Sequence, residues 1–315
     1  EKNKLKLVKS AIASLPYPGI TGDSEDKFKK TAGELKKFLN DLDLQTSNAV
    51  LSLPEEKITT RVKWFPPMKE KEVDSALQYE AEAFIPHPLE KVVLDYQIIS
   101  KDESGRLLVF IVGMLRSEIE KYTRLANLLG LDLIALEPES ISLNRILSLK
   151  EMPVMIVNVN YDHTNLISTY GQNIYLSRSA PIGIRSLSRA VKINLGLKES
   201  EADAYRETYG LKRAELEGKV RKAMMPIVEK LIRDVKQTVL SFQKDWKEDV
   251  ELIILTGDGA RTPNLAEVIT KKLGIEVQIA DPFSEISVPK NASLELEGKK
   301  ESYSIACGLA SRGLI

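Results

Sequence analysis

The chain has few of the residues that build disulfides, metal sites or histidine relays. Its 315 residues include one cysteine, Cys307, and two histidines, His87 and His163. A single cysteine excludes a disulfide within the chain and fits a reducing cytoplasm. The two histidines lie far apart in the sequence, with no cysteine or carboxylate at ligand spacing. We therefore predict neither a metal site nor a histidine-activated nucleophile.

The chain also lacks a charge excess and a long apolar run. Lys and Arg total 45, as do Asp and Glu, so the basic surface of a nucleic-acid-binding protein is not expected. The longest strongly apolar run, Leu107 to Leu115, is much shorter than the roughly 20 residues that cross a bilayer, which predicts no direct membrane span. Hydrophobic residues nevertheless make up 43% of the sequence. That content predicts a large core and at least two lobes.

One stretch combines a strand, a glycine turn and a helix start in the order typical of a nucleotide site. Leu252 to Leu255 is a short apolar run of the buried-strand type, and the turn Gly257-Asp258-Gly259 interrupts it with residues that accept positive φ. Thr262 and Pro263 suit the N-cap and the first position of a helix. Such a turn lets a flat or anionic ligand lie against the backbone near helix N–H groups. The alternative is an ordinary turn between a strand and a helix.

Helical and strand patterns alternate along the rest of the chain. Lys4 to Ala13 predicts a first strand, because leucines alternate with lysines there. From about residue 63 to 137, a helix, two strands, a second helix and a last strand predict a small α+β unit of its own. Val220 to Trp246 is the longest helical pattern, and its apolar positions predict a core helix laid across a sheet.

Together these pieces resemble the actin-like ATPase superfamily, and more narrowly the PilM family of type IV pilus assembly, which is related to the division protein FtsA. The stretches that carry the resemblance are LSLPEEKITTRV at 51–62, FPPMKEKEVDSALQYEAEAFIPHPLEKVVLDYQII at 65–99, LEPESISLNRIL at 136–147, SAPIG at 179–183, LTGDGARTPNLAEVI at 255–269 and ACGLASRG at 306–313. The most specific is the segment ending in Pro-His-Pro and followed by Val-Leu-Asp-Tyr. It belongs to the extra subdomain that separates PilM and FtsA from actin.

The resemblance implies an α/β fold of two actin-like, ribonuclease H-like lobes with an inserted α+β subdomain of the 1C type. Residues 1–62 and 137–152 would form the first lobe, and 63–136 the inserted subdomain. Residues 153–300 would form the second lobe, and 301–315 a terminal helix that returns toward the first. The family's first strand, with its first phosphate loop, falls before Glu1, so we expect it to be missing.

The resemblance also places a nucleotide, ATP or ADP with Mg²⁺, against particular residues. The second phosphate loop falls on 158–164, where two asparagines replace the Asp and Gly of the family pattern and a threonine is kept. An acidic and a basic residue follow at the positions that contact ribose and adenine, and the glycine turn completes the site. The positions are Asn158, Asn160, Thr164, Asp203, Arg206, Gly257, Asp258 and Gly259. The alternative for Asp203 and Arg206 is an ordinary surface ion pair.

The asparagine at position 158 sets the expected chemistry. An aspartate there would orient Mg²⁺ or the attacking water, so Asn158 predicts nucleotide binding with at most weak ATPase activity and no catalytic residue. A sugar or acetate kinase of the same superfamily would need that aspartate.

For the inserted subdomain the resemblance implies protein docking. The family holds a short apolar amino-terminal tail of the inner-membrane protein PilN in a groove between this subdomain and the adjoining lobe. Candidate contacts are Tyr79, Phe84, Ile85, Pro86 and Pro88, which are mostly aromatic and rigid residues in an otherwise charged stretch. The competing interpretation is that Tyr79 and Phe84 belong to the core.

The expected protein is thus a cytoplasmic scaffold, peripheral to the inner membrane through its partners, with nucleotide as a conformational ligand. Its expected partners are a PilN-type tail and other pilus motor or platform proteins. One alternative is the nucleotide-free actin-like platform domain of a type II secretion system. Another is an FtsA-like division protein, which would carry an amphipathic membrane-seeking helix.

Overall fold

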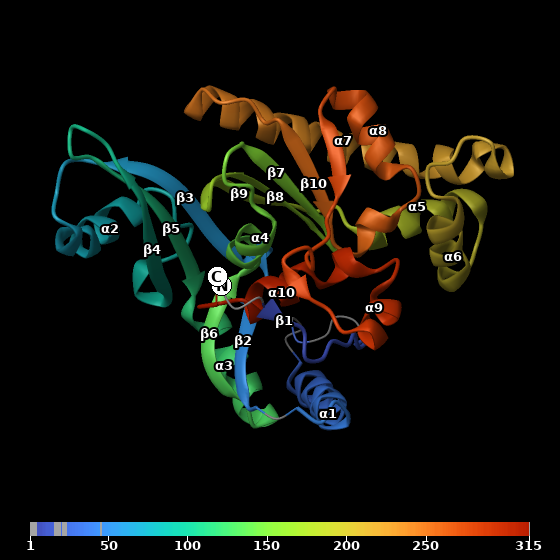
Figure 1. Cartoon of the computed structure of the whole chain (residues 1–315), viewed down its shortest axis with the longest axis horizontal. Helices are drawn as coiled ribbons and strands as arrows, with labels where there is room; N and C mark the ends of the chain where they lie inside the picture. The colour runs from blue at the N-terminus through green and yellow to red at the C-terminus, as the bar shows by residue number, and fades with distance from the viewer. Residues whose placement is uncertain (1–4, 16–19, 21–23, 45, 315) are drawn as a thin grey trace.

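The computed structural model describes residues 5–15, 20, 24–44 and 46–314. Within these residues the strands form a five-stranded sheet, a three-stranded sheet and two pairs of strands. Helices cover the sheets or cross between them, as expected of an α/β protein (Figure 1).

The five-stranded sheet has the order β11-β10-β7-β8-β9. Its strands are β7 (Val154–Val159), β8 (Thr164–Tyr170), β9 (Asn173–Ala180), β10 (Leu252–Thr256) and β11 (Glu276–Ile279). The three strands β7, β10 and β11 run parallel, whereas β8 and β9 continue the sheet antiparallel. In the parallel pair, Thr256 at the end of β10 lies opposite Asn158 near the end of β7. The glycine turn and the loop after β7 therefore emerge next to each other.

Long helices bury one face of this sheet. They include α5 (Ile184–Leu195), α6 (Glu199–Tyr209), α7 (Lys219–Trp246) and α8 (Leu265–Leu273). Apolar residues recur along α7 at helical spacing, and Val228, Leu231 and Val235 are fully buried against the sheet. The predicted core helix at Val220 to Trp246 is thus present almost to the residue. Figure 1 shows α7 running along the top of the molecule.

The three-stranded sheet has β5 at its centre, paired antiparallel with β3 and β4. The bounds are β3 (Ile58–Phe65), β4 (Val92–Lys101) and β5 (Leu107–Leu115), and α2 (Val73–Ala81) packs on one face. Short 3-10 turns, η2 (Glu55–Lys57), η3 (Glu70–Glu72) and η4 (Leu89–Lys91), precede β3, α2 and β4. The core under α2 contains Phe65, Val73, Leu77 and Val109. This sheet is separate from the five-stranded one, although Thr60 Oγ1 donates a hydrogen bond of 3.1 Å to the carbonyl of Ser177 in β9.

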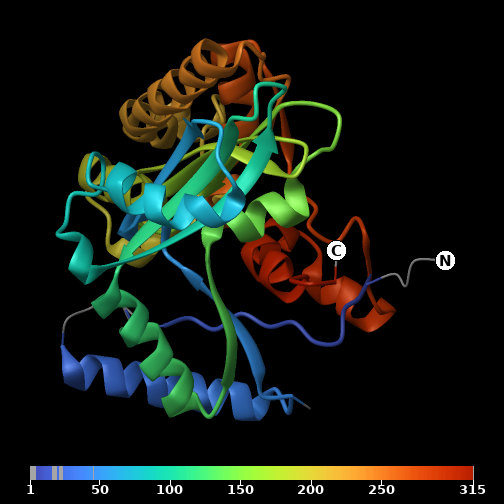
Figure 2. The ribbon, with the colours of Figure 1, turned by 90° about the vertical axis from the view of Figure 1, so that its left-hand side faces the viewer.

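A parallel pair of strands, β2 (Asn48–Leu53) and β6 (Asp132–Pro138), lies at the other end of the molecule. Figure 2 shows α1 (Glu25–Asp41) and α3 (Arg116–Leu129) next to each other, beside the lower part of this pair. Phe28 and Leu125 join these two helices through an apolar contact. The predicted domain boundaries remain a prediction. Strand β3 runs through the predicted boundary at residue 63, because residues 58–62 belong to the same strand as residues 63–65. Residues 132–136, which the prediction gives to the inserted subdomain, pair with β2.

Two helices, α4 (Glu139–Leu147) and α10 (Ser304–Ala310), cross at the centre of the molecule. Gly308 makes the close crossing possible, because a Cβ there would lie far inside van der Waals contact with the carbonyl of Ser142. Arg145 on α4 donates one hydrogen bond of 2.7 Å to the carbonyl of Gly308 and two of 2.8 Å to the carboxylate of Glu137. The two helices are therefore closely packed, and the hydrogen bond from the Arg145 guanidinium to Gly308 joins them.

The first strand is shorter than predicted. Within the described residues of the expected strand from Lys4 to Ala13, only Leu5–Lys6 forms β1, which pairs parallel with β12 (Ile286–Ser287). The last bond of the pair runs from the N–H of Leu7 to the carbonyl of Ser287. The alternating pattern continues beyond this point without a partner strand, and a strand requires one. The remaining elements are η5 (Glu215–Gly218), η6 (Asp258–Arg261), α9 (Lys290–Leu296) and η7 (Lys300–Tyr303).

Candidate functional site

The glycine turn is shaped by its contact with the end of β7. Gly257 has a φ of 79°, and a Cβ there would lie 2.5 Å from Asn158 Oδ1 and 2.7 Å from the carbonyl oxygen of Val159. A Cβ on Gly259 would overlap the side chain of Val159. Asp258, between the two glycines, is exposed. Packing alone therefore explains why positions 257 and 259 are glycine.

Asn158 is buried without partners at the same place. Its side chain is 1% exposed, and within the described residues neither Oδ1 nor Nδ2 has a hydrogen-bond partner. An orphaned buried amide is uncommon and destabilising, since each lost bond leaves a group desolvated. Asn158 and Gly257, two of the predicted nucleotide-binding residues, are thus brought into contact.

Asn160 and His163 in the loop after β7, and Asn165 in β8, contact Glu139, the first residue of α4. Glu139 is 9% exposed. Its carboxylate accepts hydrogen bonds from Asn160 Nδ2 at 3.2 Å and from the Nδ2 of Asn165. The Nε2 of His163 lies 3.4 Å from the same oxygen. Asn160, predicted to contact phosphate, is therefore engaged with a carboxylate.

His163 links this cluster to a second carboxylate. Its Nδ1 lies 3.3 Å from Glu56 Oε2 in η2, and its side chain is only 12% exposed. Burial by itself would lower the pKa of His163. The hydrogen bond and negative charge of Glu139, together with the charges of Glu56 and Glu55, outweigh burial and raise that pKa above its ordinary value. The protonated imidazole is the form that these carboxylates favour.

Glu55 sits behind the cluster and is 4% exposed. It accepts hydrogen bonds from the N–H of Ser140, at 3.1 Å, and from the hydroxyl of Ser177. Burial raises its pKa despite these two donors. Thr164, by contrast, takes no part in the cluster, because its hydroxyl donates a bond of 2.6 Å to the carbonyl of Ile182.

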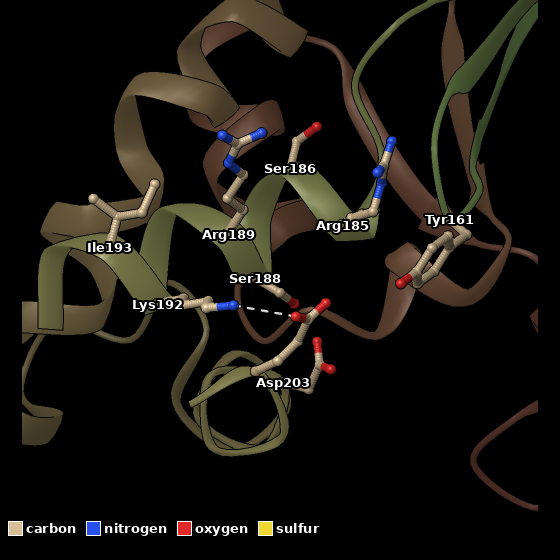
Figure 3. A pocket seen from close by; sticks show the side chains of 9 residues that line it. Tyr161, Arg185, Ser186, Ser188, Arg189, Lys192, Ile193 and Asp203 are labelled. Carbon is tan, nitrogen blue, oxygen red and sulfur yellow. Dashed lines mark hydrogen bonds and ion pairs between the residues drawn. The ribbon is translucent and has the colours of Figure 1, made fainter. Parts of the chain in front are cut away.

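A cavity of about 480 Å³ lies between α5 and α6 (Figure 3). Arg185, Arg189 and Lys192 line it from α5, Asp203 lines it from α6, and Tyr161 lies at one end. Lys192 is paired with Glu199 at 3.2 Å, and Arg185 with Asp162 at 2.5 Å. The cavity thus combines cationic side chains with carboxylates, and Asp203 is the one predicted nucleotide-binding residue in its lining.

Arg206 is not part of the cavity lining. Its side chain is nearly buried, and it donates to Ser188 Oγ at 3.1 Å and to the carboxylate of Glu207 at 2.8 Å. The alternative of a surface ion pair between Arg206 and Asp203 is therefore wrong, since the arginine pairs with its neighbour in sequence. The basic residues of α5 were missed by the sequence prediction, although their spacing at 185, 189 and 192 places them on one helical face.

A second hollow, of about 360 Å³, separates the three-stranded sheet from η2 and α3. Its apolar lining includes Ile58, Ile85, Pro86, Val92, Met114 and Leu115. Ile85 packs across β5 because Gly113 has no side chain there; a Cβ would lie 2.5 Å from Ile85 Cδ1. Glu56 and Glu118 add carboxylates to the lining, and Lys57 lies 3.9 Å from Glu118. We call this hollow the groove.

Two of the predicted partner-binding residues, Ile85 and Pro86, line the groove. Phe84 is half-buried in the adjoining apolar clusters, with the guanidinium of Arg61 over its ring at 5.4 Å. Tyr79 is 79% exposed, so the interpretation of Tyr79 as a core residue is wrong. Neither Tyr79 nor the exposed Pro88 is part of the groove lining.

Comparison with known proteins decides the family. A family model described as "Type IV pilus assembly protein PilM" matches residues 1–314. The chain belongs to the PilM family. A solved structure titled "PilM-PilN type IV pilus biogenesis complex" superposes with a TM-score of 0.83 at 20% identity, covering 98% of this chain and 90% of that one.

More distant structures show the same actin-like fold. MreB5 of Spiroplasma citri bound to ADP has a TM-score of 0.57 at 10% identity and covers 96% of this chain and 78% of that one. The MamK double helical filament has a TM-score of 0.53 at 12% identity, covering 85% and 75%. The predicted family and the predicted actin-like α/β fold are confirmed. Among the described helices, none combines the length and the hydrophobicity of a membrane-spanning segment.

Proposed function

We propose that this PilM-family chain is a cytoplasmic scaffold that holds the amino-terminal tail of a PilN-type inner-membrane protein in the groove. The observation that carries the proposal is the groove itself, because it unites Ile85 and Pro86 of the predicted docking segment with η2 and β5. A similar fold occurs in a structure titled as a complex of PilM with PilN. Membership of the PilM family favours this role over a type II secretion platform or a division protein.

The composition of the groove suits a short tail with apolar residues. Ile58, Val92 and Met114 contribute apolar surface, and Pro86 restricts the backbone at the edge. A tail anchored in a membrane protein would keep the chain peripheral to the inner membrane without a span of its own. Contacts with other pilus motor or platform proteins remain a prediction.

Binding of a synthetic peptide with the amino-terminal sequence of the PilN-type partner tests the proposal. Pro86→Asp places a carboxylate at the exposed edge of the apolar groove, and we expect it to weaken binding by about tenfold or more in calorimetry. Pro88→Asp is the matched control, since Pro88 is exposed but outside the groove lining. Equal affinities for the two folded variants would place the tail elsewhere.

For the nucleotide, the residues present fit only in part. The α5–α6 cavity offers cationic side chains for phosphate and Asp203 for ribose hydroxyls, and its volume lies within the range of small-molecule sites, about 300–1,000 Å³. On the other side, Glu139 is already occupied by amide and imidazole groups. Within the described residues, no group of three or more His, Cys, Asp or Glu is arranged to hold a metal ion.

We therefore propose that ADP or ATP binds at the α5–α6 cavity as a conformational ligand, with any Mg²⁺ held through its phosphates. Arg189→Gln removes a lining cation, and we expect nucleotide affinity to fall by about fivefold, measured by calorimetry with ADP and ATP. Arg233→Gln, an exposed position on α7 outside the cavity, is the control. An intact protein that gives no binding heat with either nucleotide would remove nucleotide from its function.

A further inference from the structure

Glu56 belongs to two sites at once. Its carboxylate lines the groove and is 37% exposed, whereas its Oε2 lies 3.3 Å from Nδ1 of the nearly buried His163. Nε2 of His163 faces Glu139 at 3.4 Å, next to Asn160 and Asn165. His163, a residue of the loop predicted to contact phosphate, therefore contacts a carboxylate that lines the groove.

Several carboxylates of the described residues gather around Glu56. Glu55 on the same turn and Glu139 on α4 add negative charge from behind, and Glu118 on α3 adds another carboxylate to the groove lining. Lys57 lies beside Glu118, at 3.9 Å. Among the ion pairs of the described residues, the partner of Glu56 is His163. Tyr122 on α3 also faces this negative charge: burial, followed by Glu118, Glu56 and Glu139, raises its pKa.

We propose that Glu56 selects a lysine or arginine in the docked tail, and that this cation takes the place of His163 as the partner of Glu56. The inference rests on the proposed docking of a tail in the groove. It defines the tail chemically, as an apolar residue against Ile85, Val92 and Met114 with a basic side chain in reach of Glu56. His163, once released from Glu56, keeps its contact with Glu139. The protonation of His163, in the loop after β7, then depends on whether the groove is filled.

Exchange of one cation for another makes binding depend on pH. In the empty protein the negative charges of Glu139, Glu56 and Glu55 outweigh burial and raise the pKa of His163. A basic side chain at Glu56 neutralises one of those charges, so the pKa of His163 falls on binding. A ligand that lowers the pKa of a group binds preferentially to its deprotonated form and releases protons. Affinity should therefore rise with pH across the imidazole range.

The experiment compares two tail peptides, the amino-terminal sequence of the PilN-type partner and the same sequence with each lysine or arginine replaced by glutamine. We expect the basic peptide to bind about fivefold more tightly near about pH 8 than near about pH 6. The glutamine-substituted peptide should bind more weakly, with the same affinity at both pH values. Calorimetry in two buffers of different ionisation enthalpy should show proton release with the basic peptide alone, without any substitution in the protein.

Variants locate the effect. Glu56→Gln should give the two peptides the same affinity, because the selecting charge is gone. His163→Gln should bind the basic peptide at the higher-pH affinity throughout. His87→Gln should keep the pH dependence, although His87 itself lines the groove.

The outcomes separate this inference from the function on which it rests. If neither peptide binds at either pH, both the docking role and the selection by Glu56 are wrong. If both peptides bind equally, or if the partner's tail has no basic residue and still binds, docking stands and the selection is overturned. Proton release that persists in His163→Gln would assign the exchange to another group.

Discussion

The glycine turn after β10 and the polar loop after β7 follow two neighbouring parallel strands and therefore lie next to each other. Different forces nevertheless determine which residues the turn and the loop contain. In the turn, Gly257 and Gly259 are required because the backbone and side chain of Val159 approach too closely for a Cβ. In the loop, Asn160 and His163 are held by the carboxylates of Glu139 and Glu56. The first constraint is steric and independent of pH; the second is electrostatic and titrates.

This contrast shows how a ligand-type motif can be maintained for other reasons. The glycines would be needed for folding whether or not a nucleotide lies against them. Asn160 and His163 already have Glu139 as a hydrogen-bond partner, so a phosphate at this loop would have to displace these contacts. The α5–α6 cavity carries its cations on a separate helix, where a phosphate would compete with Glu199 for Lys192 and with Asp162 for Arg185.

The largest effect that would sharpen the comparison is expected at the turn. Gly257→Ala combines a positive φ with overlap against Asn158 and Val159, and we expect it to lower the free energy of unfolding by about 3 kcal/mol or more. Gly274→Ala is the matched control, because its φ is 74° and no atom lies within 4 Å of the added Cβ. That control should lose only about 1 kcal/mol in urea denaturation. Equal losses would show that the turn relaxes away from β7.

Removing the acceptor at the centre of the loop cluster should have the next largest effect. Glu139→Ala leaves Asn160, His163 and Asn165 without their shared acceptor, which should lower the free energy of unfolding by about 2–3 kcal/mol. The exposed Glu285→Ala, compared by the same denaturation experiment, should change it by no more than about 0.5 kcal/mol. A cost at Glu139 as small as this would mean that the loop is stabilised without the cluster.

His163→Gln tests whether the contribution of the loop to the free energy of unfolding depends on pH, whereas that of the turn does not. Because the folded protein raises the pKa of His163, its protonated form contributes stability that is fully present below the unfolded pKa of about 6.5 and is lost as pH rises through the folded pKa. The substitution should therefore cost about 1 kcal/mol near about pH 5.5 and much less near about pH 9. Thermal unfolding across this range measures the difference. A pH-independent cost would assign His163 a packing role instead.

The smallest effect is expected where the two regions meet. Asn158→Leu removes two buried polar atoms that have no partner within the described residues, so we expect the free energy of unfolding to change by less than about 1 kcal/mol. Asn165→Leu is the comparison, since Asn165 is equally buried but donates to Glu139, and should cost about 2 kcal/mol. A larger cost at Asn158 than at Asn165 would show that the Asn158 amide is hydrogen-bonded after all.

Local patterns in the sequence were sufficient for the elements and the family. The helical repeat from Val220 to Trp246 predicts α7, and the apolar run at Leu252 to Leu255 predicts β10, because a buried face imposes its period on consecutive residues. The alternating pattern at Lys4 to Ala13 predicted a longer strand than the Leu5–Lys6 pair that forms β1. Alternation describes what a strand needs on its faces, and the partner at its edge comes from elsewhere in the chain.

Only the tertiary structure decided what the polar residues do. Glu56, Glu139 and His163 come from η2, α4 and the loop after β7, and no spacing in the sequence predicts that three separate segments will meet. The same holds for Gly257, whose need to be glycine depends on Val159 nearly 100 residues earlier. Periodicity is a property of neighbours along the chain, whereas contact, burial and the resulting charge balance are properties of neighbours in space.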